Sequence, residues 1–548
     1  MNYKNNYETW LNAEQLDKAL KIELMSLSDD EIIERFSTPL TFGTGGLRGP
    51  MGVGISRLNV HTMMQAAAGF ASYLKKHFDE GVVVISYDNR KDSKRFAEKS
   101  ALVLASYGLH AKVFESLRPT PMLSYAVRHF NAIGGIMITA SHNPKEDNGF
   151  KAYNQTGAQV NLDEAKAIIA EVEKIKDIFS IKEGPLSLIS TIDASFDDVY
   201  LKDIASIQIN QEPKTIKIVY SPLHGTGGTV IPKVLRHMGF EVIEVTEEMV
   251  PDPNFTHTES SNPEQEKAYI GAIQTAKTHD ADLILITDPD ADRLGVAVKH
   301  DDDYRLLTGN QTAAIELEYI LNQSKDVPSD GIVYTTIVTS DLIKRIAESK
   351  SLKVIETLTG FKFIGEQAEL NDAPYIFGCE ESYGSLISDK VRDKDAVQAC
   401  MILSEIANHY QSAKQTLIDR LQSIYNTFGF HLEYTESIFF RGVEGPSTME
   451  NIINDFRNTP LSIDGLTLIE WRDYKAKKLY MNNQMFDLTL PSSNVIEFRF
   501  ETAWVILRPS GTEPKLKIYF GIQAKDSHLA QNMLSLLKAQ LLKRINHE

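Results

Sequence analysis

Four short segments of the sequence hold side chains of the kinds that catalysis and ligand binding require. The first is Thr139-Ala140-Ser141-His142-Asn143-Pro144, which directly follows the apolar run Gly135–Thr139. Such a run predicts a strand, and ligands of open α/β sheets bind beyond the carboxyl ends of the strands. Ser141 beside His142 is therefore a candidate nucleophile. The alternative is an Asn-Pro turn with a capping serine, because Ser and Asn are common turn residues.

The second segment, Asp288-Pro289-Asp290-Ala291-Asp292-Arg293, follows the predicted strand Leu283–Thr287. Three carboxylates at alternating positions in a tight turn repel one another, and a divalent cation is the simplest way to stabilise them. Oxygen ligands without Cys or a paired His favour Mg²⁺ over Zn²⁺, and the spacing lacks the Gly and distal Glu of an EF-hand loop. The segment therefore predicts a Mg²⁺ site. A solvated acidic turn is the alternative.

The other two segments are suited to binding a phosphate and a sugar. Arg508-Pro509-Ser510-Gly511-Thr512-Glu513-Pro514-Lys515 combines a guanidinium, hydroxyls and glycine-freed backbone N–H groups, which suit a phosphate monoester. Gly378-Cys379-Glu380-Glu381-Ser382-Tyr383-Gly384 offers carboxylates and a hydroxyl to sugar hydroxyls. Each segment alone could be a surface turn. Together the four segments indicate phosphoryl transfer on a phosphorylated sugar, with Mg²⁺ and arginine neutralising the charge of the transferring oxygens.

The composition limits the range of partners. The chain has 548 residues, with 74 Asp and Glu against 57 Lys and Arg, for a net charge of −17. This charge disfavours a sequence-independent grip on nucleic acid, so an anionic small molecule needs a local basic pocket. Hydrophobic residues (42%) and charged residues (24%) are at ordinary globular levels. We expect small-molecule substrates and predict neither a nucleic-acid nor a protein partner.

The cysteine content and the lengths of the apolar runs indicate the cellular compartment of the protein. Cys379 and Cys400 are the two cysteines, which excludes a disulfide framework and fits a reducing compartment. The start, MNYKNNYETWLNAEQL, is polar where a secretory signal is basic and then apolar, and no run of about 18 apolar residues occurs. We therefore expect a cytoplasmic protein that is neither exported nor inserted in a membrane.

The pattern of the chain predicts α/β domains. A polar helical start over about residues 7–36 precedes β-branched runs that alternate with amphipathic stretches. The strand-turn-helix pattern restarts near Ile216 and Ile332 and changes after about Tyr434. At about 100–200 residues per domain, the length fits several domains. We expect domains at residues 1–205, 206–312, 313–434 and 435–548, the last one α+β, separately mobile and ending in one helix. The expected strands are Val82–Ser86, Ala111–Phe114, Gly135–Thr139, Ile216–Tyr220, Val242–Val245, Leu283–Thr287, Ile332–Thr336, Lys353–Glu356, Glu497–Phe500, Ala503–Leu507 and Lys515–Phe520, and the expected helices include Ser93–Tyr107 and Gln311–Leu321.

At the four segments the chain resembles the α-D-phosphohexomutase superfamily, whose signature loops are TASHNP, DPDADR or DGDADR, GEES or GEMS, and RPSGTEP. The match covers the whole chain in the right order. Within the superfamily the chain is most similar to the longer bacterial members related to the phosphoglucomutase-2 and phosphopentomutase branch. The resemblance implies a heart-shaped enzyme of three similar α/β domains and a C-terminal α+β domain around a central cleft. Further matching stretches are 43–49, 148–151, 359–362 and 392–395.

The resemblance also implies a role for each matching residue. Ser141 is expected to carry the phosphoryl group, and a phosphoserine oxygen would join Asp288, Asp290 and Asp292 in holding one Mg²⁺ per chain. The other residues fall into three groups by expected role: Arg293, Arg48 and His142 at the transfer site; Lys151 and Lys394 in proton transfer or substrate contact; and Thr359, Gly360, Glu380, Ser382, Arg508, Ser510, Gly511 and Thr512 in binding the sugar and the non-reacting phosphate.

The expected reaction interconverts glucose 1-phosphate and glucose 6-phosphate through a glucose 1,6-bisphosphate intermediate, which also serves as activator. Lys151 is the first candidate for the general base, because a lysine among cations can have a lowered pKa, and His142 is the second. Members of the superfamily with dual specificity carry Met where this chain has Glu381. Glu381 therefore favours glucose as the substrate. Pentose or mannose phosphates are alternative substrates. A phosphatase with an open site and a sugar-phosphate sensor are the remaining alternatives.

Overall fold

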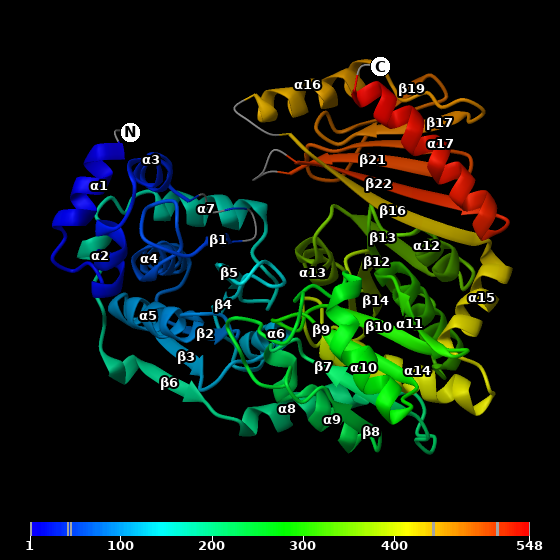
Figure 1. Ribbon diagram of the computed structural model, residues 1–548, viewed down its shortest axis with the longest axis horizontal. Helices are drawn as coiled ribbons and strands as arrows, with labels where there is room; N and C mark the ends of the chain where they lie inside the picture. Colours follow the sequence, from blue (N-terminus) through cyan, green and yellow to red (C-terminus); the bar gives the residue numbers. More distant parts are fainter. Residues whose placement is uncertain (1–2, 41–42, 44–45, 441–443, 511–514, 547–548) are drawn as a thin grey trace.

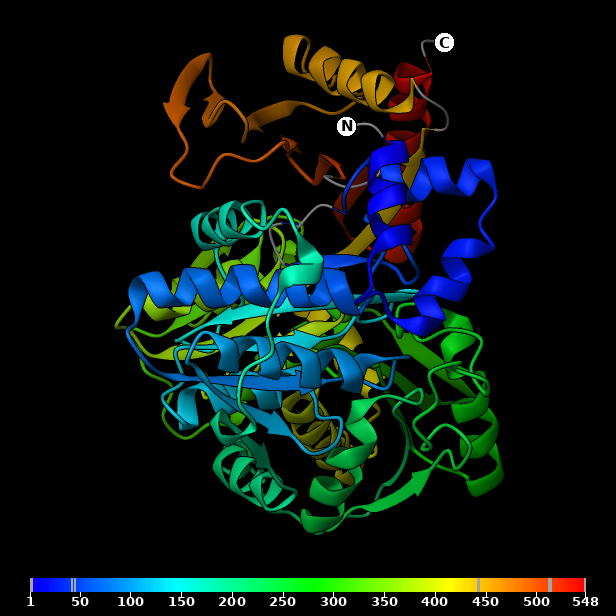
Figure 2. The ribbon, with the colours of Figure 1, turned by 90° about the vertical axis from the view of Figure 1, so that its left-hand side faces the viewer.

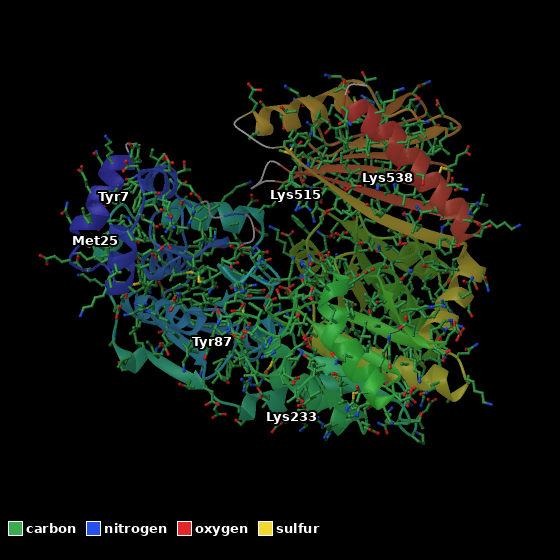
Figure 3. All side chains as sticks on the ribbon, in the orientation of Figure 1. Tyr7, Met25, Tyr87, Lys233, Lys515 and Lys538 are labelled. Carbon is green, nitrogen blue, oxygen red and sulfur yellow. The ribbon has the colours of Figure 1, made fainter. Side chains whose placement is uncertain are left out.

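The computed structural model describes residues 3–40, 43, 46–440, 444–510 and 515–546. Successive α/β units follow one another in an arc (Figure 1), with the N-terminal unit on the left and the C-terminal unit at the upper right. The fourth unit thus returns towards the first, although the two lie far apart in the sequence. Side chains fill the space between the elements of each unit (Figure 3), and Lys515 lies at the end of the fourth unit that faces the first.

The first unit is built on a sheet with the order β1-β5-β4-β2-β3-β6. Strands β2, β3, β4 and β6 are parallel, whereas β5 runs antiparallel to both β4 and β1. The central strand β4 is buried along its whole length, as a strand covered on both faces must be. The strands are β1 (Leu47–Pro50), β2 (Val82–Tyr87), β3 (His110–Phe114), β4 (Gly134–Ile138), β5 (Asp147–Asn154) and β6 (Ile189–Ile192). The helices are α4 (Val60–His77), α5 (Ser93–Ser106), α6 (Thr120–His129), α7 (Leu162–Val172) and α8 (Ser195–Ile204).

The polar start of the chain forms α1 (Tyr3–Asn12), α2 (Lys18–Met25) and α3 (Asp29–Ser37) rather than one continuous helical stretch. Asp17 caps α2, and Ser28 with Glu31 forms a capping box that starts α3. Trp10 and Phe36 pack edge to face at the centre of a small separate core. These helices project beside the first sheet (Figure 2).

The second and third units repeat the parallel strand-helix pattern. The second sheet has the order β11-β10-β9-β7-β8 and the third the order β13-β12-β14-β15. Their strands are β7 (Lys217–Ser221), β8 (Glu241–Glu244), β9 (Leu283–Thr287), β10 (Leu294–His300), β11 (Asp303–Leu307), β12 (Ile332–Thr336), β13 (Lys353–Thr357), β14 (Tyr375–Glu380) and β15 (Gly384–Leu386). Their helices are α9 (Ile231–His237), α10 (Ile270–His279), α11 (Gly309–Gln323), α12 (Asp341–Glu348), α13 (Phe361–Leu370), α14 (Ala396–Ser412) and α15 (Leu417–Phe428).

The fourth unit is an antiparallel sheet with the order β16-β22-β21-β20-β17-β18-β19. It packs against the terminal helix α17 (Ser527–Ile545) and a further helix, α16 (Gly445–Asn458), so the prediction of one helix was wrong. Met449, Ile452, Ile453 and Phe456 bury one face of α16. The strands are β16 (Phe430–Phe439), β17 (Leu468–Asp473), β18 (Lys478–Met481), β19 (Gln484–Asp487), β20 (Ile496–Phe500), β21 (Ala503–Pro509) and β22 (Lys515–Ala524).

The expected strand positions agree with the structure to within a few residues, and Leu283–Thr287 and Ile332–Thr336 match β9 and β12 end to end. The expected domain boundaries fall inside elements. The boundary after residue 434 divides β16, whose whole length pairs with β22, and the boundary after residue 312 divides α11. We therefore propose that the fourth domain begins at about Phe430.

The hydrophobic clusters connect the first three units to one another more extensively than they connect the fourth unit to the third. One continuous core contains Val84 of the first unit, Tyr220 of the second and Tyr334 of the third. The fourth unit has a core of its own, and a smaller cluster that includes Val338 and Trp504 connects it to the third unit. The first three units thus share one core, whereas the fourth is joined by a smaller contact.

Candidate active site

Ser141 lies beyond the carboxyl end of β4, where the sequence places it. Its backbone adopts φ 53°, a left-handed conformation that is uncommon for serine, and its side chain is buried. The Ser141 N–H donates a hydrogen bond of 2.8 Å to Oγ1 of Thr139. This tight turn directs the Ser141 hydroxyl at the second unit, where Oγ donates to Oδ2 of Asp288 at 2.7 Å.

Arg90 supports the turn that contains Ser141, and this residue was not identified from the sequence. Its guanidinium donates to the carbonyl oxygens of Ser141 at 2.6 Å and Asn143 at 2.5 Å, and also to those of Pro144 and Asp147. The side chain is fully buried beside Asp88. Because Asp88-Asn89-Arg90 follows β2 as the serine segment follows β4, both segments lie at the same edge of the sheet. That adjacency is the signal that could have revealed Arg90.

Asp288, Asp290 and Asp292 form a buried group after β9, with ligand atoms all within 4.8 Å of one another. Among the described residues, Oδ1 of Asp290 and Oδ1 of Asp292 are buried without a hydrogen-bond partner. Buried carboxylate oxygens that lack donors and converge in this way fit a divalent cation. The residues present therefore could hold the expected metal.

Burial and mutual repulsion shift the pKa values of the three carboxylates. Burial and the charges of Asp292 and Asp290 raise the pKa of Asp288 well above its usual range. Burial and Asp290 also raise the pKa of Asp292. Burial opposes the ionisation of Asp290 as well, but the ammonium of Lys151 outweighs it and holds the pKa of Asp290 well below its usual range.

Two lysines lie close to the carboxylates. Lys151 on β5 places Nζ 2.7 Å from Oδ2 of Asp290 and 3.7 Å from Asp292. Lys394, which precedes α14, lies 3.3 Å from Asp292 and 3.4 Å from Glu380. Burial opposes the charge of each lysine, but the carboxylates raise both pKa values. The expectation of a lowered pKa for Lys151 was therefore wrong in this structure, because carboxylates and not cations are its direct partners.

His142, Arg48 and Arg293 surround the serine. Nδ1 of His142 lies 3.2 Å from Oγ of Ser141, and burial together with Arg293 and Arg48 lowers the pKa of His142 well below its usual range. Arg48 on β1 donates to Oδ1 of Asn143 at 3.2 Å. Arg293 pairs with Glu264 at 2.5 Å and lies 3.8 Å from Oδ1 of Asp292. The imidazole is thus neutral between two guanidinium groups.

The third unit contributes the loop between β14 and β15 and the start of α13. Ser382 donates to Oε1 of Glu380 at 2.9 Å, which joins this loop to Lys394. Gly384 must lack a side chain, because a Cβ there would lie 1.9 Å from Cδ of Lys394. At the start of α13, Gly360 has φ 117°, and the buried hydroxyl of Thr359 has no hydrogen-bond partner among the described residues.

The fourth unit brings cations towards the third. Nη1 of Arg508 donates to the Tyr519 hydroxyl at 3.4 Å, and the Ser510 N–H donates to the carbonyl of Lys515 at 2.7 Å. Burial and Glu380 raise the pKa of Glu381 to about 7, and the nearby charges of Lys517 and Arg508 partly offset this rise. Lys517 was missed in the sequence, where it lies outside the motif. Gly511 and Thr512 lie outside the described residues.

The structure therefore brings Ser141, His142, Lys151, Lys394, Glu380 and the three aspartates into one cluster drawn from three units. Further contacts that sequence reasoning missed lock these units together. The Thr120 hydroxyl, at the start of α6, donates to Oδ2 of Asp290 at 3.0 Å. Tyr153 on β5 donates to Oδ2 of Asp393 at 2.7 Å. The hydrogen bonds described for Arg508 and Ser510 lie within the fourth unit, and the charge of Arg508 also acts on Glu381 of the third unit.

Comparison with known proteins shows the family. Models of phosphoglucomutase/phosphomannomutase domains match most of the chain: α/β/α domain I at residues 39–178, domain II at 198–301, domain III at 308–428 and the C-terminal domain at 472–534. The chain belongs to the phosphoglucomutase/phosphomannomutase family. The resemblance to the α-D-phosphohexomutases and the fold of three α/β domains with a C-terminal domain are thereby confirmed, and the chain is an isomerase of the phosphotransferase mutase type.

Relatives in this family cover nearly the whole chain. It is 37% identical over 531 residues to a phosphoglucomutase of Staphylococcus aureus (strain MRSA252), covering 95% of this chain and 96% of the relative. A phosphoglucomutase of Staphylococcus epidermidis (strain ATCC 12228) is likewise 37% identical, over 535 residues, with the same coverage of each chain.

Among solved structures, the fold resembles that of a putative phosphomannomutase from Thermus thermophilus, with a TM-score of 0.70 and 23% identity over 92% of this chain and 99% of that one. A family protein from Burkholderia thailandensis gives a TM-score of 0.69 at 18% identity, over 92% and 97% of the two chains. Within its described residues, the chain has no helix with the length and apolarity needed to cross a membrane.

Proposed function

We propose that the protein is a phosphoglucomutase that interconverts α-D-glucose 1-phosphate and glucose 6-phosphate. The observation that carries this proposal is the Ser141 hydroxyl, held 2.7 Å from Asp288 at a buried carboxylate trio and flanked by His142. The phosphoglucomutase relatives, at 37% identity, support glucose as the sugar. Ser141 as a phosphoserine would pass its phosphoryl group to one end of the sugar. A phosphoryl group from the other end of the glucose 1,6-bisphosphate intermediate would then restore the phosphoserine.

Asp288, Asp290 and Asp292, with a phosphoserine oxygen, would hold one Mg²⁺ per chain, which when bound neutralises charge on the transferring phosphoryl oxygens. The residues of this chain add cations around that point. Arg48 and Arg293 both lie near His142 of the serine turn, and protonated Lys151 and Lys394 balance the carboxylates. Such fixed charges stabilise a phosphoryl transition state because they need no reorganisation.

The attacking sugar hydroxyl must lose its proton. His142 is neutral and lies beside Ser141, so it is the better acceptor in the geometry of this structure. Lys151, the first candidate from the sequence, is protonated beside Asp290 and suits charge stabilisation and proton return. Both residues stay candidates for proton transfer in this proposal.

Sugar recognition is assigned to the third unit and phosphate recognition to the fourth. Thr359, Gly360, Glu380 and Ser382 would contact sugar hydroxyls. Arg508, Ser510, Gly511 and Thr512 would hold the non-reacting phosphate, with Lys517 as an added cation. The phosphate groups at the two ends of the bisphosphate are chemically alike, so one site that reads phosphate can serve both halves of the reaction.

We further propose that glucose 1,6-bisphosphate is the activator, that the partners are small sugar phosphates and not nucleic acid, protein or membrane, and that the protein is cytoplasmic. Both cysteines are free and buried, which is compatible with a reducing compartment. Pentose and mannose phosphates remain the alternative substrates, and a phosphatase or a sugar-phosphate sensor the less favoured functions.

The test is conversion of glucose 1-phosphate with Mg²⁺ and a trace of glucose 1,6-bisphosphate, run beside ribose 1-phosphate and mannose 1-phosphate. We expect glucose to be preferred and Ser141→Ala to be inactive. A preference for ribose or mannose would keep the mechanism and change the substrate. Release of inorganic phosphate as the main product would identify a phosphatase, and full activity of Ser141→Ala would refute the assignment of the nucleophile.

A further inference from the structure

Glu316 is a buried acid that the proposed reaction does not use. It lies on α11, which runs beside β14 and β10 (Figure 1), and it is fully excluded from solvent. Among the residues that the structure describes, neither carboxyl oxygen of Glu316 has a hydrogen-bond partner. Burying an ionised carboxylate without a hydrogen-bond partner or a countercharge strongly destabilises the folded state.

Among the residues that the structure describes, no cation offsets the burial of Glu316. The titratable groups that face it are the thiols of Cys379 on β14 and Cys400 on α14, both of which burial keeps protonated. Glu318, two residues along the same helix, pairs with Arg420 of α15 instead. Burial raises the pKa of Glu316 to about 8, and the Ser385 hydroxyl offsets only part of this rise. The carboxyl group is therefore neutral at pH 7.

A small, partly open cavity adjoins this carboxyl group. Its walls include Thr312 and Glu316 of α11, Leu294 of β10 and the segment Tyr383–Ser385. The space open to the centre of a water molecule is about 10 Å³, which matches the room needed by a single water. A protonated carboxyl group can both donate and accept a hydrogen bond, so it suits one such water.

The far wall of the cavity is the loop assigned to the sugar. The Tyr383 carbonyl accepts from the Leu294 N–H at 2.9 Å, and Gly384 packs against Lys394. Ser385 pairs with Cys379, the residue before Glu380. A shift of Tyr383–Ser385 would therefore move both Lys394 and Glu380.

We propose that Glu316 is a positioning residue of the sugar loop, and that as a neutral carboxylic acid it holds one buried water molecule against Tyr383–Ser385. The role in catalysis rests on the proposed function, because it assumes that this loop binds the sugar. The neutral acid and its water do not depend on that assumption. Glu316 itself does not contact the substrate.

Two variants of Glu316 test the proposal on the full-length protein, with Glu348→Gln on the exposed end of α12 as control. Glu316→Gln keeps the shape, neutrality and hydrogen-bonding groups, so we expect the KM for glucose 1-phosphate to be unchanged. Glu316→Leu removes the hydrogen bonds, and we expect KM to rise roughly tenfold with a smaller fall in kcat, because Lys394 shifts with the loop, while Ser141 phosphorylation stays unchanged. An unchanged KM in Glu316→Leu would overturn the positioning role. If that variant does not fold, Ser385→Ala, which alters the opposite wall, takes its place with the same criterion.

Infrared spectroscopy tests the neutral acid without any substrate. We expect the C=O stretching absorption of protonated carboxyl groups at pH 7 to contain one component that is lost in Glu316→Gln and retained in Glu348→Gln, as seen in difference spectra against the wild type. Because the folded-state pKa lies above the unfolded value, wild-type stability falls as pH rises through about 8. The melting temperature of Glu316→Gln should therefore exceed that of the wild type by roughly 2 °C at pH 9 and equal it at pH 5. Absence of this component, with no such divergence, would overturn the proposal whatever the substrate proves to be.

Discussion

Ser141 adopts a left-handed backbone conformation that costs on the order of 1–3 kcal/mol, so its neighbours must hold it in place. Arg90 does so by donating to carbonyl oxygens on both sides of the turn. The same turn aims Oγ at Asp288, which belongs to another unit. A single buried guanidinium thus fixes the direction of the proposed nucleophile.

Replacing Arg90 by Met should impair catalysis and stability together. Each carbonyl oxygen left without a donor costs about 1–3 kcal/mol, and a shift of the serine by about 1 Å can cost roughly 10²-fold in rate. We expect kcat to fall by about that factor and the melting temperature to drop. The measurements are steady-state kinetics and thermal unfolding.

The matched control is Arg95→Met, which removes a partly exposed ion pair with Asp17 in the same unit. Such a pair contributes at most about 1 kcal/mol, so kcat should stay unchanged. If Arg90→Met lost stability but kept the wild-type kcat, Arg90 would be structural only.

The carboxylate trio makes a second prediction at this scale. Asp288→Asn removes one of three buried like charges while Oδ1 can still accept from the N–H groups of Asp292 and Arg293. Without metal, this variant should melt a few degrees above the wild type, because burial and its neighbours raise the pKa of Asp288 and its ionisation opposes folding.

With Mg²⁺ bound, we expect the wild type to be more stable than Asp288→Asn. Wild type should gain about 2.7 kcal/mol at a Mg²⁺ concentration 100 times its Kd, whereas Asp288→Asn should gain little. Thermal unfolding with EDTA and with Mg²⁺ measures both effects, and Asp280→Asn, an exposed change in the same unit, is the control. Equal stabilisation of both proteins by Mg²⁺ would place the metal elsewhere.

At the scale of elements, the segment 392–395 joins the third unit to the first. Tyr153 of β5 donates to Asp393, and Tyr200 of α8 donates to Asp395, which also caps α14. Lys394 lies between these two anchors and reaches Asp292. A strand of the first unit therefore helps to position a lysine that the third unit supplies, and a helix of the first unit supports the start of α14.

Replacing each of these two tyrosines by Phe should affect kcat and the melting temperature differently. Tyr153→Phe removes a hydrogen bond from a carboxylate that lies 3.6 Å from Nζ of Lys394, so we expect kcat to fall about tenfold. Tyr200→Phe acts on the helix cap, so it should lower the melting temperature with little change in kcat. Kinetics and thermal unfolding of both variants provide the comparison, and an unchanged kcat in Tyr153→Phe would show that this tyrosine does not position Lys394.

How far the sequence predicts these elements depends on burial. Strands buried on both faces, such as β9 and β12, carry continuous apolar runs and were predicted to the residue. In contrast, β19 is exposed along its length, so no apolar run marks it. The helix α16 was also missed, although its first turn contains Pro446 and Pro suits the first turn of a helix.

The same reasoning applies to the site. Ser141 and the three aspartates follow strands within short motifs, so the sequence could place each of them at the carboxyl edge of its own sheet. Arg90, Thr120 and Tyr153 act through contacts between segments far apart in the chain, which a single sequence does not pair. The pKa of Lys151 was misjudged for that reason, since its partners come from another unit.

At the scale of the whole molecule, the fourth unit is joined to the others less extensively than they are to one another. Its links to the third unit include the ion pair of Arg499 with Asp341, a hydrogen bond from Ser340 to Glu433 and the small cluster around Val338 and Trp504. The first three units share one continuous core. Rotation of the fourth unit about these contacts would bring Arg508 towards a bound phosphate while the serine and the carboxylates stay fixed, and would exclude water from the transfer.

Arg508→Ala tests this arrangement. A guanidinium that holds a phosphate contributes about 1.5–3 kcal/mol per charged hydrogen bond, so we expect KM to rise roughly 10- to 100-fold, with partial recovery in Arg508→Lys, which keeps the charge but not the fork. Arg345→Ala is the control, because this exposed arginine contacts Gln523 of the fourth unit and lies outside the proposed phosphate site. Small-angle scattering should show that glucose 1,6-bisphosphate compacts the wild type and Arg345→Ala but not Arg508→Ala. An unchanged KM in Arg508→Ala would remove the phosphate assignment, whereas a raised KM with normal compaction would separate phosphate binding from closure.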